Sequence, residues 1–478
     1  MLFNSFEFAI FFAIVFLLYW SLPRPGQNIL LLAASYIFYG LWSWKFLPLL
    51  FFCTLASYGT ADRIAASSDA KTRRLWLICG LVLNLGVLVV FKYCNFFLEN
   101  FYDFLALLGI SVSKNFFNII LPIGLSFYTF QAMSYTFDVY RRVMKPAGTL
   151  LDYMTYLSFF PQLVAGPIGR APALLPQFLL PRKFNTAQFK QGLYLIFWGL
   201  FQKIFVADNL ARIVQPVFNS PGMYHGSDVL VALYAFAMQL YCDFAGYSNI
   251  ARGLAATLGF NLMVNFNLPF WATNAQDFWN NWHISLSSWV RDYIYFPLMG
   301  ALRKIKGNTR IYAAVVISFT LMGLWHGAAW HFVVFGLYYG ILISLLIIIR
   351  IRFARFIAPK SPRGVALWYW LRLIFMFNLT ASAMLFFHAS SLAQVGEILS
   401  RIGASTSTQL PRWEAWGKLA GFSLPVFMME YAELKTKDPF FVLNKMSWFP
   451  RIALLAFLTY LILGWGVMTA EEFIYFQF

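Results

Sequence analysis

A long apolar stretch with a histidine inside it constrains this chain more than any other feature. Residues 311–340 read IYAAVVISFTLMGLWHGAAWHFVVFGLYYG and contain no Lys, Arg, Asp or Glu. This is more apolar sequence than the ~20 residues that one helix needs to cross a bilayer. His326 lies within it. An imidazole is costly there, so it either marks a functional site or packs in a core, hydrogen-bonded to a neighbouring helix.

Apolar runs of this kind recur along the whole chain. Of its 478 residues, 60% are hydrophobic and only 12% are charged, whereas soluble domains carry ~25% charged residues. The first run has no Lys or Arg before Arg24 and leads into further runs, so we expect a retained span rather than a cleaved signal peptide. The sequence thus predicts an all-α, polytopic integral membrane protein, with a single membrane-embedded domain over residues 1–478.

Twelve apolar segments are candidate membrane spans, and short basic loops separate many of them. The net charge of +17 therefore does not indicate nucleic acid, because the positive-inside rule and anionic lipid account for it. With the N-terminus outside, these basic loops all face the cytoplasm. Some segments are short, so we expect about 11–12 transmembrane helices. The segments are 6–22, 28–44, 46–60, 74–93, 118–137, 191–207, 228–248, 311–329, 332–349, 366–387, 414–431 and 451–468. The basic loop residues include Arg63, Arg141, Arg303, Arg352, Lys360 and Lys435.

Three other segments do not fit a simple span. Residues 95–111 carry two acidic side chains and are expected at the membrane interface. Residues 151–182 contain five prolines, which one regular helix cannot hold, so we expect a re-entrant loop that lines a cavity and includes Gln162. Residues 271–297 have the pattern of an amphipathic helix.

The third of these segments is a second candidate site. It contains DFWNNWHISLSSWVRDYIYFPL, and at helical spacing Trp279, His283, Ser287 and Arg291 share one face, with further aromatic residues around them. The alternative is an amphipathic helix at the membrane interface, where Trp and Tyr are common. A second histidine near an intramembrane one favours a joint site with His326.

Several long motifs extend this pattern over nearly the whole chain. WNNWHISLSSWVRDYIYFPL and GLWHGAAWHF contain the two histidines; LPIGLSFYTFQAMSYTFDVYRR, FFPQLVAGPIGRAPALLPQF, YCDFAGYSNIARGLAATLGF and the ending EEFIYFQF occur around them. Together they resemble the membrane-bound O-acyltransferase (MBOAT) family, in particular its bacterial branch of alginate O-acetylation membrane subunits. The resemblance implies the MBOAT fold, with helices around a central tunnel, and a catalytic role for His326. Asn281, Met299, Phe335 and Tyr339 depart from the family pattern.

The chemistry of acyl transfer is consistent with these residues. Moving an acetyl group from a thioester to a hydroxyl needs a base, and histidine has a suitable pKa near neutrality. We expect His326 to be that base and His283 to hold the thioester, the acceptor or the departing charge; an acyl-histidine intermediate is the less favoured route. A triad with Ser285, Ser287 or Ser288 is disfavoured, because these serines share the helix of His283 and lack a nucleophile elbow.

Other residues are expected to support the site. We expect Asp243 at membrane depth, where it should face protein or water, in a structural pair with Arg252. His326 and His331 are five residues apart and do not form a two-histidine metal face, and no Cys or His spacing suits zinc, so no metal is expected. The remaining supporting or tunnel-lining candidates are Trp279, Asn280, Ser287, Arg291, Asp292, Trp325 and Gln162.

The resemblance also implies a cellular role. It points to O-acetylation in a bacterial cell inner membrane, with alginate as the first candidate and cellulose, another exopolysaccharide or peptidoglycan next. The basic cytoplasmic loops favour the anionic donor acetyl-CoA; a carrier-protein donor, as in teichoic acid D-alanylation, stays open. A transporter or flippase for a polysaccharide precursor is the non-enzymatic alternative, but it leaves the two histidine motifs unexplained.

No outer loop is long enough to recognise a polymer by itself. The longest candidates, near 208–227 and 388–413, are far shorter than the ~50 residues of a small domain. We therefore expect a separate extracytoplasmic partner, which places the acetyl group on the polysaccharide acceptor. The resemblance implies that this partner is a periplasmic protein with an esterase-like active site.

Overall fold

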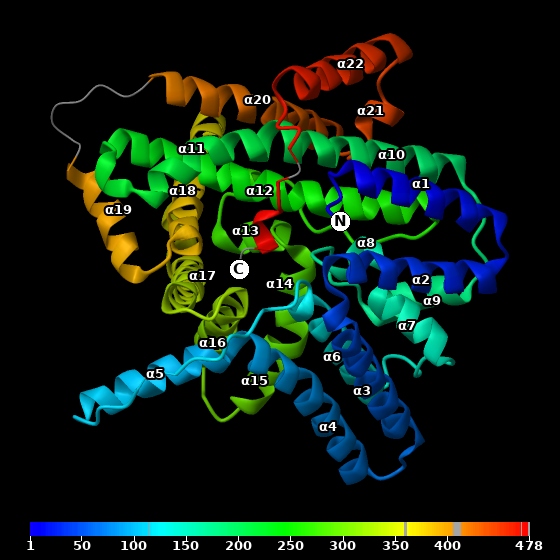
Figure 1. Cartoon of the computed structure of the whole chain (residues 1–478). Helices are drawn as coiled ribbons and strands as arrows, with labels where there is room; N and C mark the ends of the chain where they lie inside the picture. Colours follow the sequence, from blue (N-terminus) through cyan, green and yellow to red (C-terminus); the bar gives the residue numbers. More distant parts are fainter. Residues whose placement is uncertain (114, 358–360, 405–412, 470, 477–478) are drawn as a thin grey trace. The chain divides into compact units, whose positions relative to one another are not determined.

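The computed structural model describes residues 1–113, 115–357, 361–404, 413–469 and 471–476. Lys360 of a predicted cytoplasmic loop, residues 405–412 of the predicted outer loop and the last two residues of EEFIYFQF lie outside these ranges. The described residues form helices and irregular segments with no β-strand, which confirms the all-α fold (Figure 1). They divide into two compact units, Met1–Leu193 with Ala251–Met263, and Tyr194–Ile250 with Val264–Phe478.

The first unit contains the N-terminal helices. Within it α3, α4 and α6 pack together, and α2 packs on α7. Its elements are α1 (Phe6–Ser21), α2 (Arg24–Ser43), η1 (Trp44–Phe46), α3 (Leu47–Ala66), α4 (Ala70–Leu88), η2 (Val89–Tyr93), α5 (Cys94–Leu107), α6 (Leu125–Tyr140), α7 (Leu150–Ser158), α8 (Phe160–Leu163) and α9 (Ala171–Leu179).

Two helices, α10 (Thr186–Leu200) and α12 (Gly226–Thr257), continue along the chain from one unit into the other. The second unit holds the remaining elements. They are η3 (Phe201–Ala207), α11 (Asp208–Asn219), η4 (Pro221–Met223), η5 (Pro269–Trp271), α13 (Ala275–Asn281), α14 (Ile284–Val290), η6 (Arg291–Tyr295), α15 (Phe296–Ala301), α16 (Thr309–His326), α17 (Trp330–Ile357), α18 (Pro362–His388), α19 (Leu392–Ala404), α20 (Trp413–Thr436), α21 (Phe441–Asn444), α22 (Trp448–Trp465) and η7 (Ile474–Phe476).

Seven helical stretches in the described part of the chain are long and apolar enough to cross a membrane, so this is a multi-pass membrane protein. Eight of the twelve predicted spans lie wholly or mostly in these stretches, and the segments 6–22, 118–137, 311–329 and 414–431 do not. In the segment 118–137 the helix begins only at Leu125, after Pro122 and Gly124, whose φ is 78°. The stretches are Arg24–Ala66, Ala70–Leu107, Thr186–Asn219, Gly226–Thr257, Trp330–Arg352, Pro362–His388 and Trp448–Trp465.

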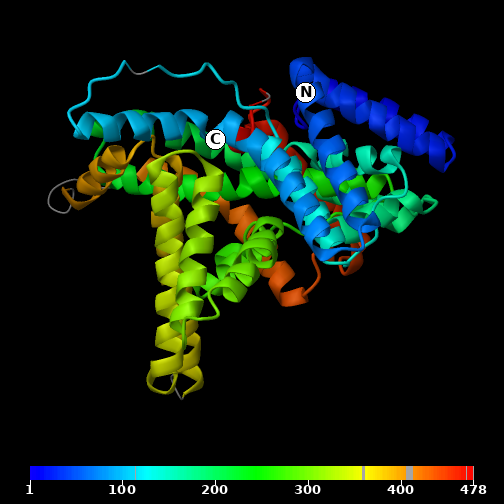
Figure 2. The ribbon, with the colours of Figure 1, turned by 90° about the horizontal axis from the view of Figure 1, so that it is seen from below.

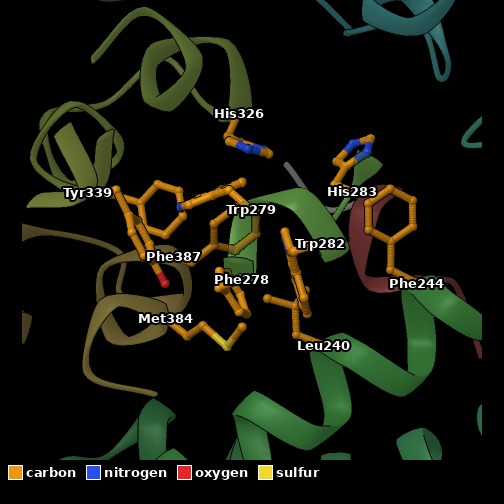
Figure 3. Close-up of a pocket in the computed structure, with 11 residues that line it drawn as sticks. Leu240, Phe244, Phe278, Trp279, Trp282, His283, His326, Tyr339, Met384 and Phe387 are labelled. Atoms are coloured by element: carbon orange, nitrogen blue, oxygen red, sulfur yellow. The ribbon is translucent and has the colours of Figure 1, made fainter. Parts of the chain in front are cut away.

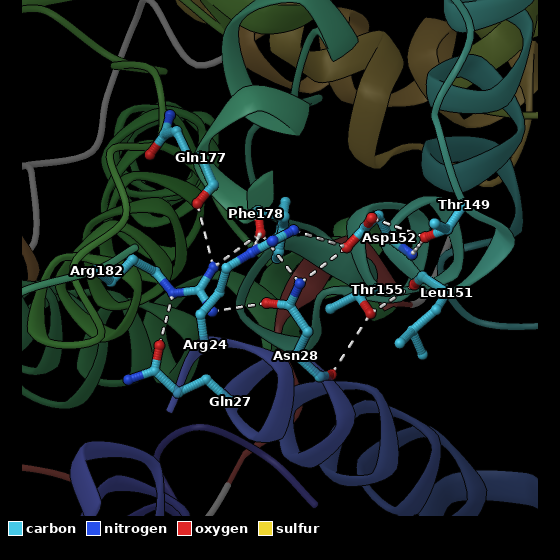
Figure 4. A network of polar contacts seen from close by, with 10 residues as sticks. All are labelled: Arg24, Gln27, Asn28, Thr149, Leu151, Asp152, Thr155, Gln177, Phe178 and Arg182. Atoms are coloured by element: carbon cyan, nitrogen blue, oxygen red, sulfur yellow. Dashed lines mark hydrogen bonds and ion pairs between the residues drawn. The ribbon is translucent and has the colours of Figure 1, made fainter. Parts of the chain in front are cut away.

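The proline-rich segment is divided into α7, α8 and α9, as its prolines require, and a polar network holds it to α2 (Figure 4). Thr149 caps α7 by accepting from the backbone N–H of Asp152 at 3.1 Å. Asn28 on α2 donates to the Asp152 carboxylate at 2.9 Å and accepts from the Arg182 guanidinium at 2.6 Å. Each polar group of this network therefore has partners inside the first unit.

Glycines allow the close packing of α16 against α17 in the second unit. A Cβ at Gly323 would overlap the backbone oxygen of Phe332, and a Cβ at Gly336 would overlap that of Phe319. Small residues let two helices in a membrane approach each other closely. Helix α17 in turn lies beside α18, as Figure 2 shows. This helix pair fixes where the chain turns between α16 and α17, which is where His326 lies.

Candidate active site

His326 is the last residue of α16, and the chain reverses directly after it. The next residue, Gly327, is extended, and a Cβ there would overlap the ring of Phe332. Only glycine fits this close approach. The His326 ring is 4% exposed and lies edge-on to Phe335 and Phe387, with centroid distances of 5.9 and 5.1 Å. The GLWHG motif thus places an imidazole at a helix end inside an aromatic core.

His283 lies at a break between two short helices, which corrects the predicted single helical face. Asn274 starts α13 by capping the N–H of Asp277, and α13 ends at Asn281. His283 then adopts the left-handed conformation, with φ 43° and ψ 52°, before α14 begins. Such a conformation is uncommon outside glycine and is often found at functional sites. The break separates His283 from the face that was predicted to continue along the helix.

An asparagine that the sequence analysis missed holds the His283 ring. The side-chain oxygen of Asn265 accepts from the backbone N–H of Ser285 at 3.2 Å and from the Ser285 hydroxyl at 2.9 Å. The same oxygen is 3.2 Å from Nδ1 of His283. Because a backbone N–H can only donate, this end of the amide is the oxygen, so Nδ1 of His283 carries the proton and Nε2 has the lone pair.

The ring of His283 is also neutral. It is fully buried, and burial lowers the pKa of His283 to about 3, because an imidazolium would lose its hydration there. The second amide end of Asn265 donates to Ser248 at 3.0 Å, which fixes the amide orientation. In the sequence, the motif that contains Asn265 is NFN at residues 265–267. Its backbone forms hydrogen bonds with the backbone of residues 281 and 284, which lie on either side of His283.

Both histidines line one small cavity (Figure 3). Its volume is about 10 Å³, which is room for about one water molecule. The ring of Trp325 lies 6.2 Å from that of His283 and 4.9 Å from that of His326. Two of the positions that depart from the family pattern, Phe335 and Tyr339, are in the wall. None of the lining residues is charged; they are Leu240, Phe244, Phe278, Trp279, Trp282, His283, His326, Phe335, Tyr339, Met384 and Phe387.

A second, larger cavity of about 310 Å³ shares Trp279 with the first. One side is polar, with Asn280, Ser287 and Arg291, and the other is formed by apolar residues of α16 and α17. Trp279 is 5% exposed, and its indole Nε1 has no hydrogen-bond partner among the described residues. Asp292 pairs with Arg291 at 2.8 Å at the surface. The predicted supporting residues of α13 and α14 thus line a space next to the histidine cavity.

Asp243 belongs to a separate ion cluster, and the prediction that it pairs with Arg252 was wrong. Its carboxylate lies 2.7 Å from Nζ of Lys203, and its other oxygen accepts from the backbone N–H of Ile474 at 2.7 Å. Lys203 also contacts Asp208 at 2.9 Å. Because Lys203 is 40 residues away in sequence, spacing along one helix could not identify it. This cluster secures the C-terminal segment.

Gln162 lies in the first unit, where it donates to the backbone oxygen of Tyr156 at 3.2 Å.

A buried glutamate lies behind the aromatic wall and was also missed. Glu430 on α20 accepts from the Tyr241 hydroxyl at 2.5 Å and from the indole N–H of Trp271 at 2.9 Å. The Tyr241 ring in turn lies 6.0 Å from that of Trp282, which lines the histidine cavity. Glu430 thus fixes residues that support this wall without lining the cavity itself.

Comparison with known proteins is consistent with this geometry. The sequence model of the membrane-bound O-acyltransferase family matches residues 147–388, a range that includes both histidines. The chain is 37% identical over 395 residues to a probable alginate O-acetylase AlgI of Azotobacter vinelandii, covering 82% of this chain and 76% of that protein.

Relatives with other acceptors are similar as well. A peptidoglycan O-acetyltransferase of Helicobacter pylori is 34% identical over 381 residues, covering 72% of this chain and 70% of that protein. A teichoic acid D-alanyltransferase of Bacillus subtilis is 31% identical over 235 residues, covering 48% and 59%. These similarities leave no support for the transporter alternative. The chain belongs to the membrane-bound O-acyltransferase family and is a multi-pass membrane O-acyltransferase.

Proposed function

We propose that this protein transfers an acetyl group from a cytoplasmic thioester, acetyl-CoA, across a bacterial inner membrane for O-acetylation of an extracytoplasmic polysaccharide, with alginate as the first candidate. The observation that carries the proposal is the cavity lined by His283 and His326, in a chain similar over most of its length to alginate O-acetylases. Cellulose, another exopolysaccharide and peptidoglycan are the next candidates for the acceptor.

The larger cavity is the proposed site of the donor's thiol arm. A pantetheine chain has amide groups and methylene groups, which suit a space with a polar side and an apolar side. Arg291, which lines this cavity and pairs with Asp292, supplies guanidinium N–H donors for an anionic group of the donor. Trp279 borders both cavities, so a thioester held in the larger one has its carbonyl near the histidines.

The two histidines have different proposed roles. His326 accepts the proton of the attacking hydroxyl; the hydroxyl oxygen bonds to the carbonyl carbon, the carbon–sulfur bond breaks, and the thiolate takes the proton back from His326. His283 is neutral with its proton on Nδ1, so its Nε2 can accept a hydrogen bond but cannot donate one. We therefore assign His283 to orienting the acceptor through a donor other than the reacting hydroxyl, rather than to stabilising the departing thiolate.

Trp279 supplies a hydrogen-bond donor in this scheme. Its Nε1–H is buried without a partner, and buried donors are almost always satisfied. We assign it to the acyl carbonyl oxygen, where negative charge develops during attack. Donors of this kind are worth ~10²–10³-fold in turnover.

A relay to a partner completes the proposal. In the residues that the structure describes, each of the two longest predicted outer segments contains a short α-helix, α11 and α19 respectively. Gln394 on α19 donates to the backbone oxygen of Phe218 on α11 at 2.7 Å, so these helices pack on each other. A separate esterase-like periplasmic protein would then accept the acetyl group and place it on the polymer.

Reconstitution tests these assignments. The purified protein is placed in liposomes with isotope-labelled acetyl-CoA on one side and polysaccharide on the other, with and without the partner; His326→Ala is the control. We expect labelled polymer only with the partner and with His326. Efficient labelling without the partner would refute the relay, and labelling by His326→Ala would refute the assigned base.

A carrier-protein donor, suggested by the similarity to D-alanyltransferases, is distinguished in the same assay. A D-alanyl group carries an ammonium ion, and the histidine cavity has no carboxylate among its lining residues to receive it. An acetyl group is neutral and smaller. Replacing acetyl-CoA with an acetylated carrier protein leaves the acyl group unchanged and tests the donor alone.

A further inference from the structure

One serine hydroxyl in the wall of the larger cavity has no partner within the protein. Ser318 on α16 is 2% exposed, and its Oγ has no hydrogen-bond partner among the residues that the structure describes. The other two serines of this wall, Ser287 and Ser288, each donate to a backbone oxygen of their own segment. A buried polar group without a partner is rare in folded proteins, so Ser318 is an exception that calls for a partner outside the protein.

The usual behaviour of a hydroxyl inside a helix does not apply to Ser318. Serine and threonine side chains within helices often bond to the backbone oxygen four residues earlier. Thr320 on the same helix does so with Val316 at 2.8 Å. On α17, Ser344 does so with Gly340 at 2.8 Å. Ser318 makes no such bond and lines the cavity instead, so its hydroxyl is available to a molecule inside it.

The cavity follows one face of α16 toward His326. Its lining residues on this helix begin at Ile311 and end at Met322, one turn before the histidine, and those next to Ser318 are apolar. Ser318 precedes His326 by eight residues, which is ~12 Å along the helix at ~1.5 Å per residue. A ligand with its reacting carbonyl beside His326 therefore passes Ser318 ~12 Å further along its chain.

A pantetheine arm carries amide groups at two distances from its thioester. At ~1.2 Å per bond of an extended chain, the nearer amide carbonyl lies ~6 Å and the farther one ~11 Å from the thioester carbonyl. The farther amide matches the distance between Ser318 and His326 along α16. The acyl chain of a lipid has no polar group at this distance and would leave the hydroxyl without a partner.

We propose that the Ser318 hydroxyl donates a hydrogen bond to the farther amide oxygen of the donor's pantetheine arm and thereby selects donors that carry this amide. This inference rests on the proposed use of acetyl-CoA at His326 and adds a residue that discriminates between thioesters. Ser318 takes part in no covalent step, so the bond contributes equally to binding of the donor and of the transition state. Loss of such uniform binding raises KM and leaves kcat unchanged.

The test measures donor kinetics in Ser318→Ala with three acetyl thioesters. Inside-out membrane vesicles that contain the protein and the rest of its acetylation system receive acetyl-CoA, S-acetyl-pantetheine or S-acetyl-N-acetylcysteamine, and the released thiol gives the rate. The first two donors carry both amides, and the third carries only the nearer one. We expect Ser318→Ala to lower kcat/KM ~3–10-fold for the first two donors, because one neutral hydrogen bond is lost, and to leave that of the third unchanged. For acetyl-CoA the change should lie in KM, with kcat close to wild type.

Two controls separate this effect from a structural one. Ser344→Ala removes a buried hydroxyl that is bonded to Gly340 and does not line the cavity, so it should keep the wild-type KM for each donor. Because the hydroxyl of Ser318 has no partner in the described part of the chain, Ser318→Ala should not lower the thermal unfolding midpoint in detergent. A lowered midpoint would assign the hydroxyl to the fold and overturn the inference.

The outcomes distinguish the inference from the function beneath it. An unchanged KM for acetyl-CoA in an active Ser318→Ala variant refutes the hydrogen bond and leaves the proposed function standing. An equal loss with all three donors places the effect at the thioester end and refutes the assignment to the farther amide. Failure of wild-type vesicles to use any of the three donors contradicts the proposed acetyl-CoA donor itself.

Discussion

Lys203 and His326 are both buried ionisable side chains of the second unit, but their surroundings differ in kind. Lys203 has two carboxylates within 2.9 Å and the backbone oxygen of Glu472 at 3.1 Å. His326 shares a space lined by aromatic and aliphatic side chains, none of them charged. In the first case a buried cation contacts two carboxylates; in the second an imidazole borders a cavity.

This difference separates a structural site from a chemical one. A buried ion cluster connects segments that are distant in sequence, here η3, α12 and the C-terminal segment at Ile474. It therefore contributes to holding the fold. A histidine beside an apolar cavity contributes little to folding, but it can take up a proton from a substrate. The comparison predicts that substitutions at the two sites fail in different ways.

The largest effect is expected at His326. His326→Ala should lower acetyl transfer ~10²–10⁴-fold, because a general base is lost. The protein should still insert and accumulate, since the side chain borders a cavity. The measurement is polymer acetylation per amount of membrane-inserted protein.

His331→Ala is the matched control for this variant. His331 is five residues further on and contacts the backbone oxygen of Phe386 at 2.8 Å, outside the cavity wall. It should retain most of the activity. Near-normal acetylation by His326→Ala would overturn the assignment of the base.

The next largest effect is expected at Lys203, where substitution should lower stability and leave turnover unchanged. Lys203→Met leaves Asp208 and Asp243 buried without their cation and should destabilise the protein by ~3–5 kcal/mol. The measurement is the thermal unfolding midpoint in detergent, together with turnover per folded molecule, which should stay close to wild type. Lys190→Met, on the exposed face of α10, is the control and should change neither quantity.

A double variant sharpens this test. Adding Asp243→Asn to Lys203→Met removes one of the stranded charges and should recover part of the lost stability. If the single variant were as stable as wild type but inactive, the ion cluster would belong to the chemistry instead.

The sequence was sufficient for the features that depend on local pattern. The all-α fold, the proline-broken segment and His326 all follow from hydropathy and from the cost of an ionisable side chain in apolar surroundings. The helix break at His283 did not follow, because no glycine or proline marks it and the aromatic spacing continues through it. The partners of Asp243 and His283 were missed because Lys203 and Asn265 reach them through tertiary packing.

A smaller, pH-dependent effect is expected at Asn265. In wild type the pKa of His283 is lowered to about 3, so the ring stays neutral above that pH. Asn265→Asp places a carboxylate beside Nδ1 and should raise the pKa of His283 by ~1–3 units. As pH falls through the raised value, Nε2 becomes protonated and can no longer accept a hydrogen bond from the acceptor. The variant should therefore lose activity toward pH 5 relative to wild type; identical pH profiles would contradict the assigned role of His283.

The smallest effect is expected at Glu430. Like Lys203, it is a buried ionisable side chain with partners of its own, although it lies behind the wall of the histidine cavity. Its carboxylate contacts two neutral donors, Tyr241 and Trp271, and not the cavity. Glu430→Gln keeps the shape and one acceptor oxygen, so it should cost about 1 kcal/mol of stability and leave turnover nearly unchanged. Glu430→Leu leaves both donors unsatisfied and should cost more, because buried donors without partners are expensive. Unfolding midpoints and initial rates of the two variants measure this. A large loss of turnover in Glu430→Gln at unchanged stability would place this glutamate with the histidines and remove the distinction between the two kinds of buried site.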